Sequence, residues 1–471
     1  MKRIFAAILA FAMFSQAYAG PIDDARRLYR SGKYAAAIEY ARKVVKRTPR
    51  DGNGNFFLGA SLYKLGRFDE ALAPLRQAES RGVAEASQML TEYYMKHYNV
   101  DKAEEHLDSW AEILQKGKKS LPKGYDYLSS QLVKLRNMLG RVERLEIVDS
   151  LSVDSARFFD AIRLSPQAGR ILPPESVGSI GAMAASELST GYMPENNSEI
   201  LWSASDSNGR FELYGAGILD DGTLDHPTAL SGNLGEGGDA RYPFLMPDGV
   251  TLYFANNGEN SLGGYDIFLT RRTDDGYFVP QNMGMPYNSP DNDYMLAIDE
   301  TSGLGWLVTD RNHVPGKLTV YVFLPSAMRV NADPDDVNLE ALARLSDISL
   351  SRNPDTDYSA LLASKLPDDG SDDGSRVNNS SPRFMIDMGN GKIYTSLNQF
   401  RNKNARSAMI EYLNGQVQLR RLLASQSILR DKYSKGDRSV AQTILDNEDS
   451  TAHLRKELIN LRNKAISLET D

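Results

Sequence analysis

The sequence of 471 residues predicts a multidomain α + β protein: a solenoid of paired helices, then a β-propeller of about five blades, then long C-terminal helices. Three repeating patterns support this fold class. Small and apolar residues recur after 34 residues near the N-terminus, and a strand-rich motif occurs three times at intervals of about fifty residues. An apolar seam with alternating steps of four and three runs through the C-terminal end. Each of these periods is typical of one architecture.

Residues 1–19 have the pattern of a secretory signal peptide. Lys2 and Arg3 precede an apolar run over Ile4–Phe14, and Ala17-Tyr18-Ala19 fits a small-x-small cleavage site. The alternative is a retained membrane anchor, but the run is short for a membrane-spanning helix. We therefore expect an exported mature protein without a membrane segment, in the periplasm or associated with the outer membrane.

The amino-acid composition excludes several kinds of covalent chemistry and one class of partner. The sequence contains no cysteine, so disulfides, thiol nucleophiles and a lipidated cysteine are excluded. The formal net charge is −8, and the basic residues are in excess only in the N-terminal part, before about residue 148. An acidic remainder argues against nucleic acid as a partner.

Residues 20–144 carry the helical repeat. The first set of residues is matched 34 residues later by the second: Gly32, Tyr34, Ala37, Ala41, Val44 and Pro49 correspond to Gly66, Phe68, Ala71, Leu75, Ala78 and Val83. This is the tetratricopeptide period, with small residues where paired helices cross. A degenerate third unit includes Ala103, Leu107 and Trp110, and a helix over 128–139 would close the stack.

The concave face of these repeats is the predicted partner-binding site, by resemblance to other tetratricopeptide grooves. It would hold a peptide or a helix of a protein partner, with an acidic or carboxylate-bearing segment favoured by the basic residues. Arginine and tyrosine are residue types that anchor interfaces well. The candidate residues are Arg26, Tyr29 and Arg30 on the first repeat and Asn53, Phe56, Ala60, Tyr63 and Lys64 on the second.

Residues 145–330 are predicted to form propeller blades. Each copy of the motif has three β-rich runs separated by turn residues, and such small sheets bury their faces against neighbouring sheets. The runs are 192–194, 198–206 and 211–218, then 242–249, 250–256 and 264–270, then 294–299, 304–310 and 318–324. Because three blades cannot close a ring, we expect another blade from 145–190 and returning strands at 383–400.

The rest of the chain is predicted to be an insertion and a helical tail. Residues 331–382 hold a short helix and an acidic, mobile surface loop at 366–375. Residues 401–471 should form coiled-coil-like helices, with a seam at Val440, Ile444, Asn447, Thr451, Leu454, Leu458, Leu461, Ala465 and Leu468. The two helices could fold back as a hairpin, pack on the chain's own domains, or dock a second protein.

Few residues suggest catalysis or cofactor binding, and we predict no catalytic residue, metal or cofactor. The five histidines have no metal-ligand spacing, and no nucleophile elbow or phosphate-binding loop is present. The acidic turns at 220–222, 274–276 and 291–293 could supply oxygens to calcium, but Asp and Gly are also ordinary hairpin residues. A glycosidase would need two carboxylates across a bond, which a sequence cannot reveal.

One local motif, Ser261-Leu-Gly-Gly-Tyr-Asp-Ile-Phe268, favours a tight turn before a strand over a ligand contact. Together with 242–255 and 282–290 it resembles the TolB-type, WD-repeat-like propeller of exported bacterial proteins. Joined to tetratricopeptide repeats, the arrangement is similar to the periplasmic repeat-propeller subunit associated with type IX secretion, and this resemblance covers roughly residues 25–325. It implies a scaffold near the outer membrane. The chain departs from that subunit in having no lipidated cysteine and in ending in helices instead of a peptidoglycan-binding domain.

These observations predict a non-enzymatic periplasmic scaffold or adaptor that binds envelope proteins through its helical repeats and propeller. One alternative is a propeller-type envelope hydrolase, which convergent carboxylates in the central funnel would favour. A second is a structural oligomer formed by the C-terminal helices.

Overall fold

The computed structural model describes residues 20–179, 188–206, 208–219, 223–230, 234–235, 237–326, 328–353, 356–365, 386–388, 393–394, 397–434 and 437–470. The predicted signal peptide and the acidic loop at 366–375 lie outside these residues. The chain divides into two compact units, Met1–Val133 with Gly389–Gly391, and Lys134–Met388 with Lys392–Asp471. Each unit is described by itself.

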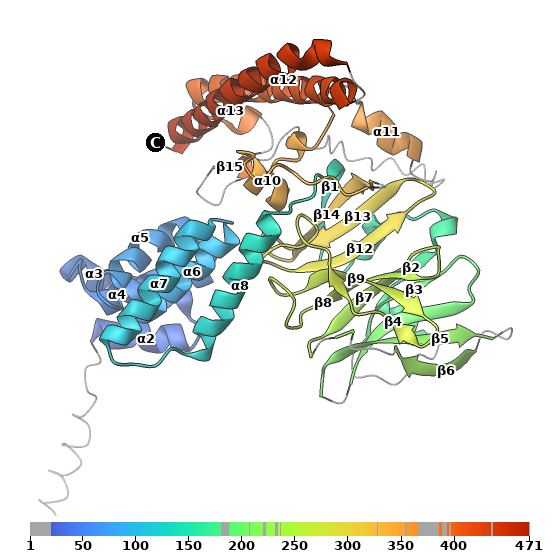
Figure 1. The fold of residues 1–471 in the computed structure, drawn as a ribbon. Helices are drawn as coiled ribbons and strands as arrows, with labels where there is room; N and C mark the ends of the chain where they lie inside the picture. Colours follow the sequence, from blue (N-terminus) through green and yellow to red (C-terminus); the bar gives the residue numbers. More distant parts are fainter. Residues whose placement is uncertain are drawn as a thin grey trace, which may run out of the picture. The chain divides into compact units, whose positions relative to one another are not determined.

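The first unit is built from antiparallel helix pairs, as the 34-residue period predicts. The helices are α2 (Pro21–Arg30), α3 (Tyr34–Arg47), α4 (Gly52–Lys64), α5 (Phe68–Glu79), α6 (Ala84–Lys96), α7 (Val100–Lys116) and α8 (Lys123–Leu139), of which α8 crosses the boundary between the units (Figure 1). Helices α2 and α3, α4 and α5, and α6 and α7 pack against each other as three pairs.

Small residues set the distance between paired helices. Ala37, Ala41, Ala71 and Ala78 are fully buried. A Cβ added at Gly59 of α4 would lie 2.7 Å from Cγ of Leu75 on α5, so a larger residue would push these helices apart. The repeated residues of the sequence pattern are therefore the contact residues of the helix pairs.

Among its described residues, the second unit contains three antiparallel sheets of four or five strands and one two-stranded ribbon. The first sheet has the order β2-β3-β4-β5-β6, the second β10-β9-β8-β7 with β11 also paired to β9, and the third β1-β14-β13-β12 (Figure 1). Their strands are β1 (Glu146–Asp154), β2 (Arg170–Leu172), β3 (Leu188–Met193), β4 (Glu199–Ser205), β5 (Phe211–Ile218), β6 (Leu224–Ala229), β7 (Ala240–Leu245), β8 (Thr251–Asn256), β9 (Asp266–Thr273), β10 (Gly276–Tyr277), β11 (Gln281–Asn282), β12 (Asp293–Asp299), β13 (Leu304–Thr309) and β14 (Lys317–Leu324). Each copy of the sequence motif thus supplies three neighbouring strands of one sheet.

The expectation of a further blade over 145–190 is wrong. Strand β1 pairs with β14 from Glu146↔Leu324 to Asp154↔Lys317, and β2 pairs with β3. The third motif copy has only three strands, and its edge strand β14 would expose a row of unpaired N–H and C=O groups. Strand β1 satisfies these groups, so this region completes existing sheets.

The returning strands also differ from the prediction. Among the described residues, β15 (Ile386–Asp387) and β16 (Ile393–Tyr394) pair only with each other. The Tyr394 ring packs edge-on against Phe400 at 5.0 Å, and its hydroxyl donates to Glu469 near the C-terminus. This ribbon belongs to the core of the C-terminal helices. The described residues therefore show three sheets of four or five strands in place of about five blades, and they do not show a closed ring.

The three sheets pack side by side through large apolar residues. Strand β7 packs against β3 and β4, and β12 packs against β7 and β8. The Tyr192 ring of β3 meets the Phe244 ring of β7 edge-on at 5.0 Å, and both side chains are buried. Because each small sheet buries its apolar face against the next sheet, we expect it to be stable only when its neighbours are present.

The segment after β11 binds the second sheet to the third through polar groups. Asn288 accepts a hydrogen bond from Ile267 N at 2.6 Å and donates to Ile267 O at 2.9 Å. On the other side, buried Arg311 donates to buried Asp293 at 2.6 Å. Segment 288–293 therefore works as a clamp that is hydrogen-bonded to both sheets.

The paired glycines of the 261–268 motif make room for this clamp. A Cβ at Gly263 would lie 2.2 Å from the carbonyl oxygen of Asp291, and one at Gly264 would lie 1.9 Å from Oδ1 of Asn292. The motif therefore has a structural role, as its turn-forming interpretation predicts.

The C-terminal part forms an antiparallel helical hairpin of α12 (Lys403–Ser434) and α13 (Ala441–Thr470) (Figure 1). The seam residues Thr451, Leu458 and Ala465 are buried at seven-residue intervals. A Cβ at Gly415 of α12 would lie 2.5 Å from Cδ2 of Leu458, so the helices approach closely there. The seam is thus used within the chain. Shorter helices are α9 (Pro174–Ser179), α10 (Leu339–Arg344) and α11 (Tyr358–Lys365).

The substitution Gly263→Ala is expected to destabilise the second unit by about 1–3 kcal/mol, because the added methyl group meets a backbone oxygen that cannot move aside freely. Urea unfolding followed by circular dichroism measures the loss. Gly217→Ala is the matched control, since its added Cβ would have ordinary contacts at 3.8 and 3.9 Å. Equal stability of the two variants would contradict the clamp.

The buried carboxyl group of Asp266 should make the free energy of unfolding depend on pH. Burial, together with the Asp293 carboxylate, raises the pKa of Asp266 to about 7, although Leu262 N, Gly263 N and the Asn282 amide donate to it. A raised folded-state pKa gives a stabilising contribution that is complete below the unfolded pKa of about 3.9 and is lost as the pH rises through about 7.

The free energy of unfolding of the wild type, minus that of Asp266→Asn, should therefore fall between about pH 5 and about pH 8. Urea titrations at several pH values measure this difference. For Asp248→Asn the corresponding difference should stay flat in this range, because hydrogen bonds from Val250 and Thr251 lower the pKa of Asp248 against the effect of its burial. A flat difference for Asp266 as well would show that its carboxyl group is ionised throughout.

Candidate functional site

The candidate site is the face formed by the first helix of each pair, α2, α4 and α6, which we call the inner face. Helix α4 contacts both α2 and α6. Residues three and four apart lie on one side of a helix. The resulting stripes are Arg26, Tyr29 and Arg30 on α2, Asn53, Phe56, Ala60, Tyr63 and Lys64 on α4, and Glu85, Gln88, Glu92 and Lys96 on α6.

An aromatic cluster joins the first two helices of the inner face. The half-buried Tyr29 ring lies 6.2 Å from Phe56 and 5.7 Å from Phe57. The Arg26 guanidinium stands over the Phe57 ring at 5.8 Å. The structure therefore brings Arg26, Tyr29 and Phe56 together, while Tyr63 packs 5.0 Å from Phe68 of α5.

The remaining predicted residues differ in their exposure. Asn53, Arg30 and Lys64 are exposed, and Arg30 and Lys64 have no ion-pair partner among the described residues. Ala60 is fully buried, so its inclusion among the contact residues is wrong. Its small side chain fits a position that neighbouring side chains cover.

The third repeat adds acidic residues that the sequence interpretation missed. Gln88 donates to Glu92 at 2.9 Å. Burial, the neighbouring Tyr34 and the Glu92 carboxylate raise the pKa of Tyr29, so a group on α6 acts on a group on α2. A two-residue slip in the repeat hid this stripe, which the i, i+4 spacing of Gln88 and Glu92 could have indicated.

In the second unit, tyrosines of the repeated motif meet where β7, β9 and β12 begin. The half-buried rings of Tyr242, Tyr265 and Tyr294 lie 5.9–6.4 Å apart. Asp239 accepts from the Tyr265 hydroxyl at 2.7 Å, and Asp310 accepts from the Tyr294 hydroxyl at 3.1 Å.

These two carboxylates bear on the hydrolase alternative, and both are engaged in structural hydrogen bonds. Asp239 also accepts from Phe211 N at 3.1 Å, and Asp310 accepts from Asn292 N at 2.8 Å and from the Asn292 amide at 2.7 Å. A glycosidase needs one carboxyl group to donate a proton and the other to act on the sugar or on water. The observed bonds instead fix both groups as acceptors, which does not favour that reaction.

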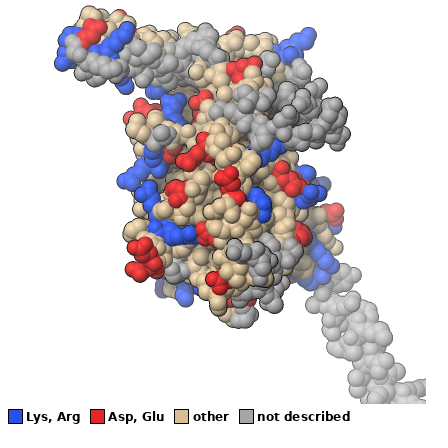
Figure 2. Space-filling view, turned by 90° about the vertical axis from the view of Figure 1, so that its right-hand side faces the viewer, with Lys and Arg blue, Asp and Glu red and all other residues tan. Residues whose placement is uncertain are grey.

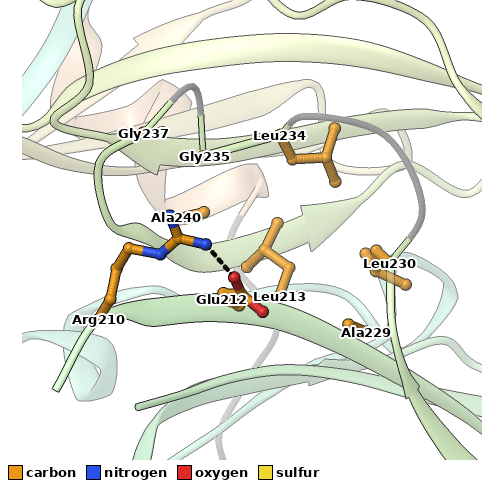
Figure 3. A pocket seen from close by; sticks show the side chains of 9 residues that line it. All are labelled: Arg210, Glu212, Leu213, Ala229, Leu230, Leu234, Gly235, Gly237 and Ala240. Carbon is orange, nitrogen blue, oxygen red and sulfur yellow. Dashed lines mark hydrogen bonds and ion pairs between the residues drawn. The ribbon is translucent and has the colours of Figure 1, made fainter. Parts of the chain in front are cut away.

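A small pocket of about 150 Å³ lies between β5, β6 and the segment before β7 (Figure 3). Buried Leu213 and Leu234 line it, and Arg210 forms an ion pair with Glu212 beside it. Because the two charges neutralise each other, the pocket offers no free charged group from this pair.

Among the described residues, neither the charged side chains on the face shown in Figure 2 nor the possible metal ligands indicate a further binding site. On the face drawn in Figure 2, acidic and basic side chains are interspersed instead of gathered by sign. No group of three or more His, Asp or Glu residues in the described part of the chain is placed to hold a metal ion. Within the same residues, every helix is too short or too polar to cross a membrane.

The comparison with protein families supports the repeat assignment. A family described as tetratricopeptide repeat matches residues 22–87, which include the stripes of α2 and α4. No curated protein matches the chain. Tetratricopeptide repeats are protein-interaction modules and are typically non-catalytic, so the matched region suggests protein–protein interaction.

The substitution Glu92→Gln should lower the pKa of Tyr29, because it removes a negative charge that disfavours the tyrosinate. NMR titration of ¹³C-labelled tyrosine measures the shift, with Tyr29→Phe assigning the signal. Glu85→Gln is the control, since Glu85 lies nearer the start of α6 and does not contribute to the shift of Tyr29. An unchanged Tyr29 pKa in Glu92→Gln would mean that the two side chains do not face each other.

Proposed function

We propose that this protein is a non-enzymatic, exported scaffold or adaptor that binds an acidic segment of a cell-envelope protein on the inner face. The observation that carries the proposal is the pair of exposed cations Arg30 and Lys64, which have no ion-pair partner in the part of the chain that the structure describes. They follow Tyr29 and Tyr63 on the face that also carries Phe56. Exposed cations attract carboxylates, and half-buried aromatic rings offer apolar contact area at low entropic cost.

The finer parts of the proposal come from the sequence. The signal-like segment at 1–19 supports a periplasmic location, and the motifs at 242–290 support a TolB-type propeller that works near the outer membrane or in secretion assembly. In this scheme the helical repeats hold the partner, and the three sheets provide a rigid second platform.

A crosslinking experiment in intact cells tests the proposal. The variant Arg26→Glu, Arg30→Glu, Lys64→Glu should lose proteins that the wild type captures in the periplasmic fraction, with binding weakened by at least about tenfold. The matched control reverses three exposed cations at the end of the first repeat, Lys46, Arg47 and Arg50. Unchanged capture by the inner-face variant, or absence of the protein from the periplasmic fraction, would refute the corresponding part of the proposal.

A further inference from the structure

Helix α13 carries a second apolar stripe beside the seam that packs on α12. In four successive heptads the residue after the seam residue is also apolar: Leu445, Ala452, Ile459 and Ile466 follow Ile444, Thr451, Leu458 and Ala465. One residue turns an α-helix by about 100°, so these positions lie roughly a quarter turn away from the seam. We call Leu445, Ala452 and Ile459 the outer stripe.

The outer stripe is exposed to solvent, although its residues are apolar. The exposed fraction is 55% for Leu445 and 38% for Ile459, and Ala452 between them is also exposed. Ile466, by contrast, is half-buried and packs against the core of the hairpin. Packing within the hairpin therefore accounts for residue 466 but not for the apolar character of the outer stripe.

Two opposite charges lie along one side of the outer stripe. Asp449 and Lys456 are seven residues apart and exposed, and neither has an ion-pair partner in the part of the chain that the structure describes. With a rise of about 1.5 Å per residue, their backbone positions are about 10 Å apart along α13, on successive heptads. They therefore do not meet as neighbours on the helix, where pairs are three or four residues apart.

The charges on the other side of the outer stripe are used within the chain. Glu448 forms an ion pair with Arg430 of α12 at 2.7 Å. Seven residues later, Arg455 lies 4.0 Å from Asp336, which is outside the hairpin. Only the side with Asp449 thus offers charges that are not already engaged in such pairs among the described residues.

The order of these residues is self-complementary when two copies of α13 run in opposite directions. With a two-fold axis at Ala452, Leu445 comes level with Ile459 of the partner subunit, because each is seven residues from the axis. Asp449 lies three residues before the axis and Lys456 four after it, so opposite charges come level on the same side. In a parallel pair, like charges would lie level instead.

We propose that the outer stripe binds a second copy of this chain, as an antiparallel, two-fold symmetric pair of α13 helices centred on Ala452. The small central side chain lets the helices approach closely, and leucine and isoleucine are buried on both sides of it. Two ion pairs between Asp449 and Lys456 set direction and register. The contact area is small, so the dimer is weak and forms as concentration rises. This inference goes beyond the proposed function and does not depend on the inner face.

Sedimentation velocity of the full chain over about 1–100 µM measures the association, and the average mass should rise from monomer towards dimer. Ile459→Glu should weaken the dimer by at least about tenfold, because it buries a charge in the contact. Ile410→Glu is the matched control, since Ile410 is exposed to 39% but lies on α12. A chain that stays monomeric throughout, or equal loss in both variants, would overturn the proposal.

Charge exchange tests the ion pairs. Asp449→Lys and Lys456→Asp should each weaken the dimer by about tenfold, because each places like charges together across the axis. The variant with both changes restores the pairs with their signs exchanged and should associate like the wild type. If the double variant stays as weak as the single ones, these residues do not face each other. Circular dichroism confirms that each variant is folded.

Because the sequence contains no cysteine, single cysteine substitutions report the direction of the helices. Ala452→Cys should form a disulfide-linked dimer on mild oxidation, since both thiols lie at the axis. Leu445→Cys should not link to itself, but it should link to Ile459→Cys when the two variants are mixed. Efficient self-linking of Leu445→Cys would indicate a parallel pair, and linking at none of these positions would contradict the dimer. Neither result would affect binding at the inner face.

Discussion

The close approach of one loop to a pair of glycines holds the β-rich unit together. The carbonyl oxygen of Asp291 lies where a side chain at Gly263 would stand, and Asn288 and Asp293 tie the same segment to the second and third sheets. A two-sided polar clamp of this kind needs every buried group satisfied, because an unpaired buried polar group is costly. Glycine at 263 therefore lets the clamp approach this closely, since an added side chain would displace it and weaken the stacking of the sheets.

The helical unit depends on a different constraint, which is the size of the residues where helices cross. Gly59 lies against Leu75 in the second pair, and the buried Ala25, Ala37 and Ala41 keep the side chains small in the first pair. The same requirement for small side chains explains why residue 60 is an alanine. Ala60 belongs to the predicted contact stripe, but neighbouring residues bury it fully. Sequence periodicity shows which residues share one side of a helix. The solvent exposure of each residue also depends on the neighbouring helices, which the periodicity does not describe.

Much of the local structure could be predicted from the sequence, because the nine β runs and the paired helices depend on local patterns of two and of three to four residues. The pairing of strands could not. Strand β1 joins β14 across more than 160 residues, because an edge strand accepts a partner from any part of the chain. For the candidate site, the spacing of Arg26, Tyr29 and Phe56 predicts that they share one face, whereas Glu92 was missed because the third repeat shifts its register and only the i, i+4 spacing of Gln88 and Glu92 points to it.

The two units differ in how far the hydrogen-bonding and ion-pairing capacity of their charged side chains is already used within the chain. In the β-rich unit the charged groups near the tyrosine cluster are occupied: Asp239 and Asp310 each accept several hydrogen bonds, and Arg311 is buried against Asp293. These bonds stabilise the fold and leave the carboxylates little capacity for a ligand. On the inner face, Arg30 and Lys64 have no ion-pair partner among the described residues and are exposed to solvent. A charge without an ion-pair partner among the described residues can meet a ligand's carboxylate without first breaking an internal ion pair, so electrostatic recognition is assigned more readily to the helical repeats than to the sheets.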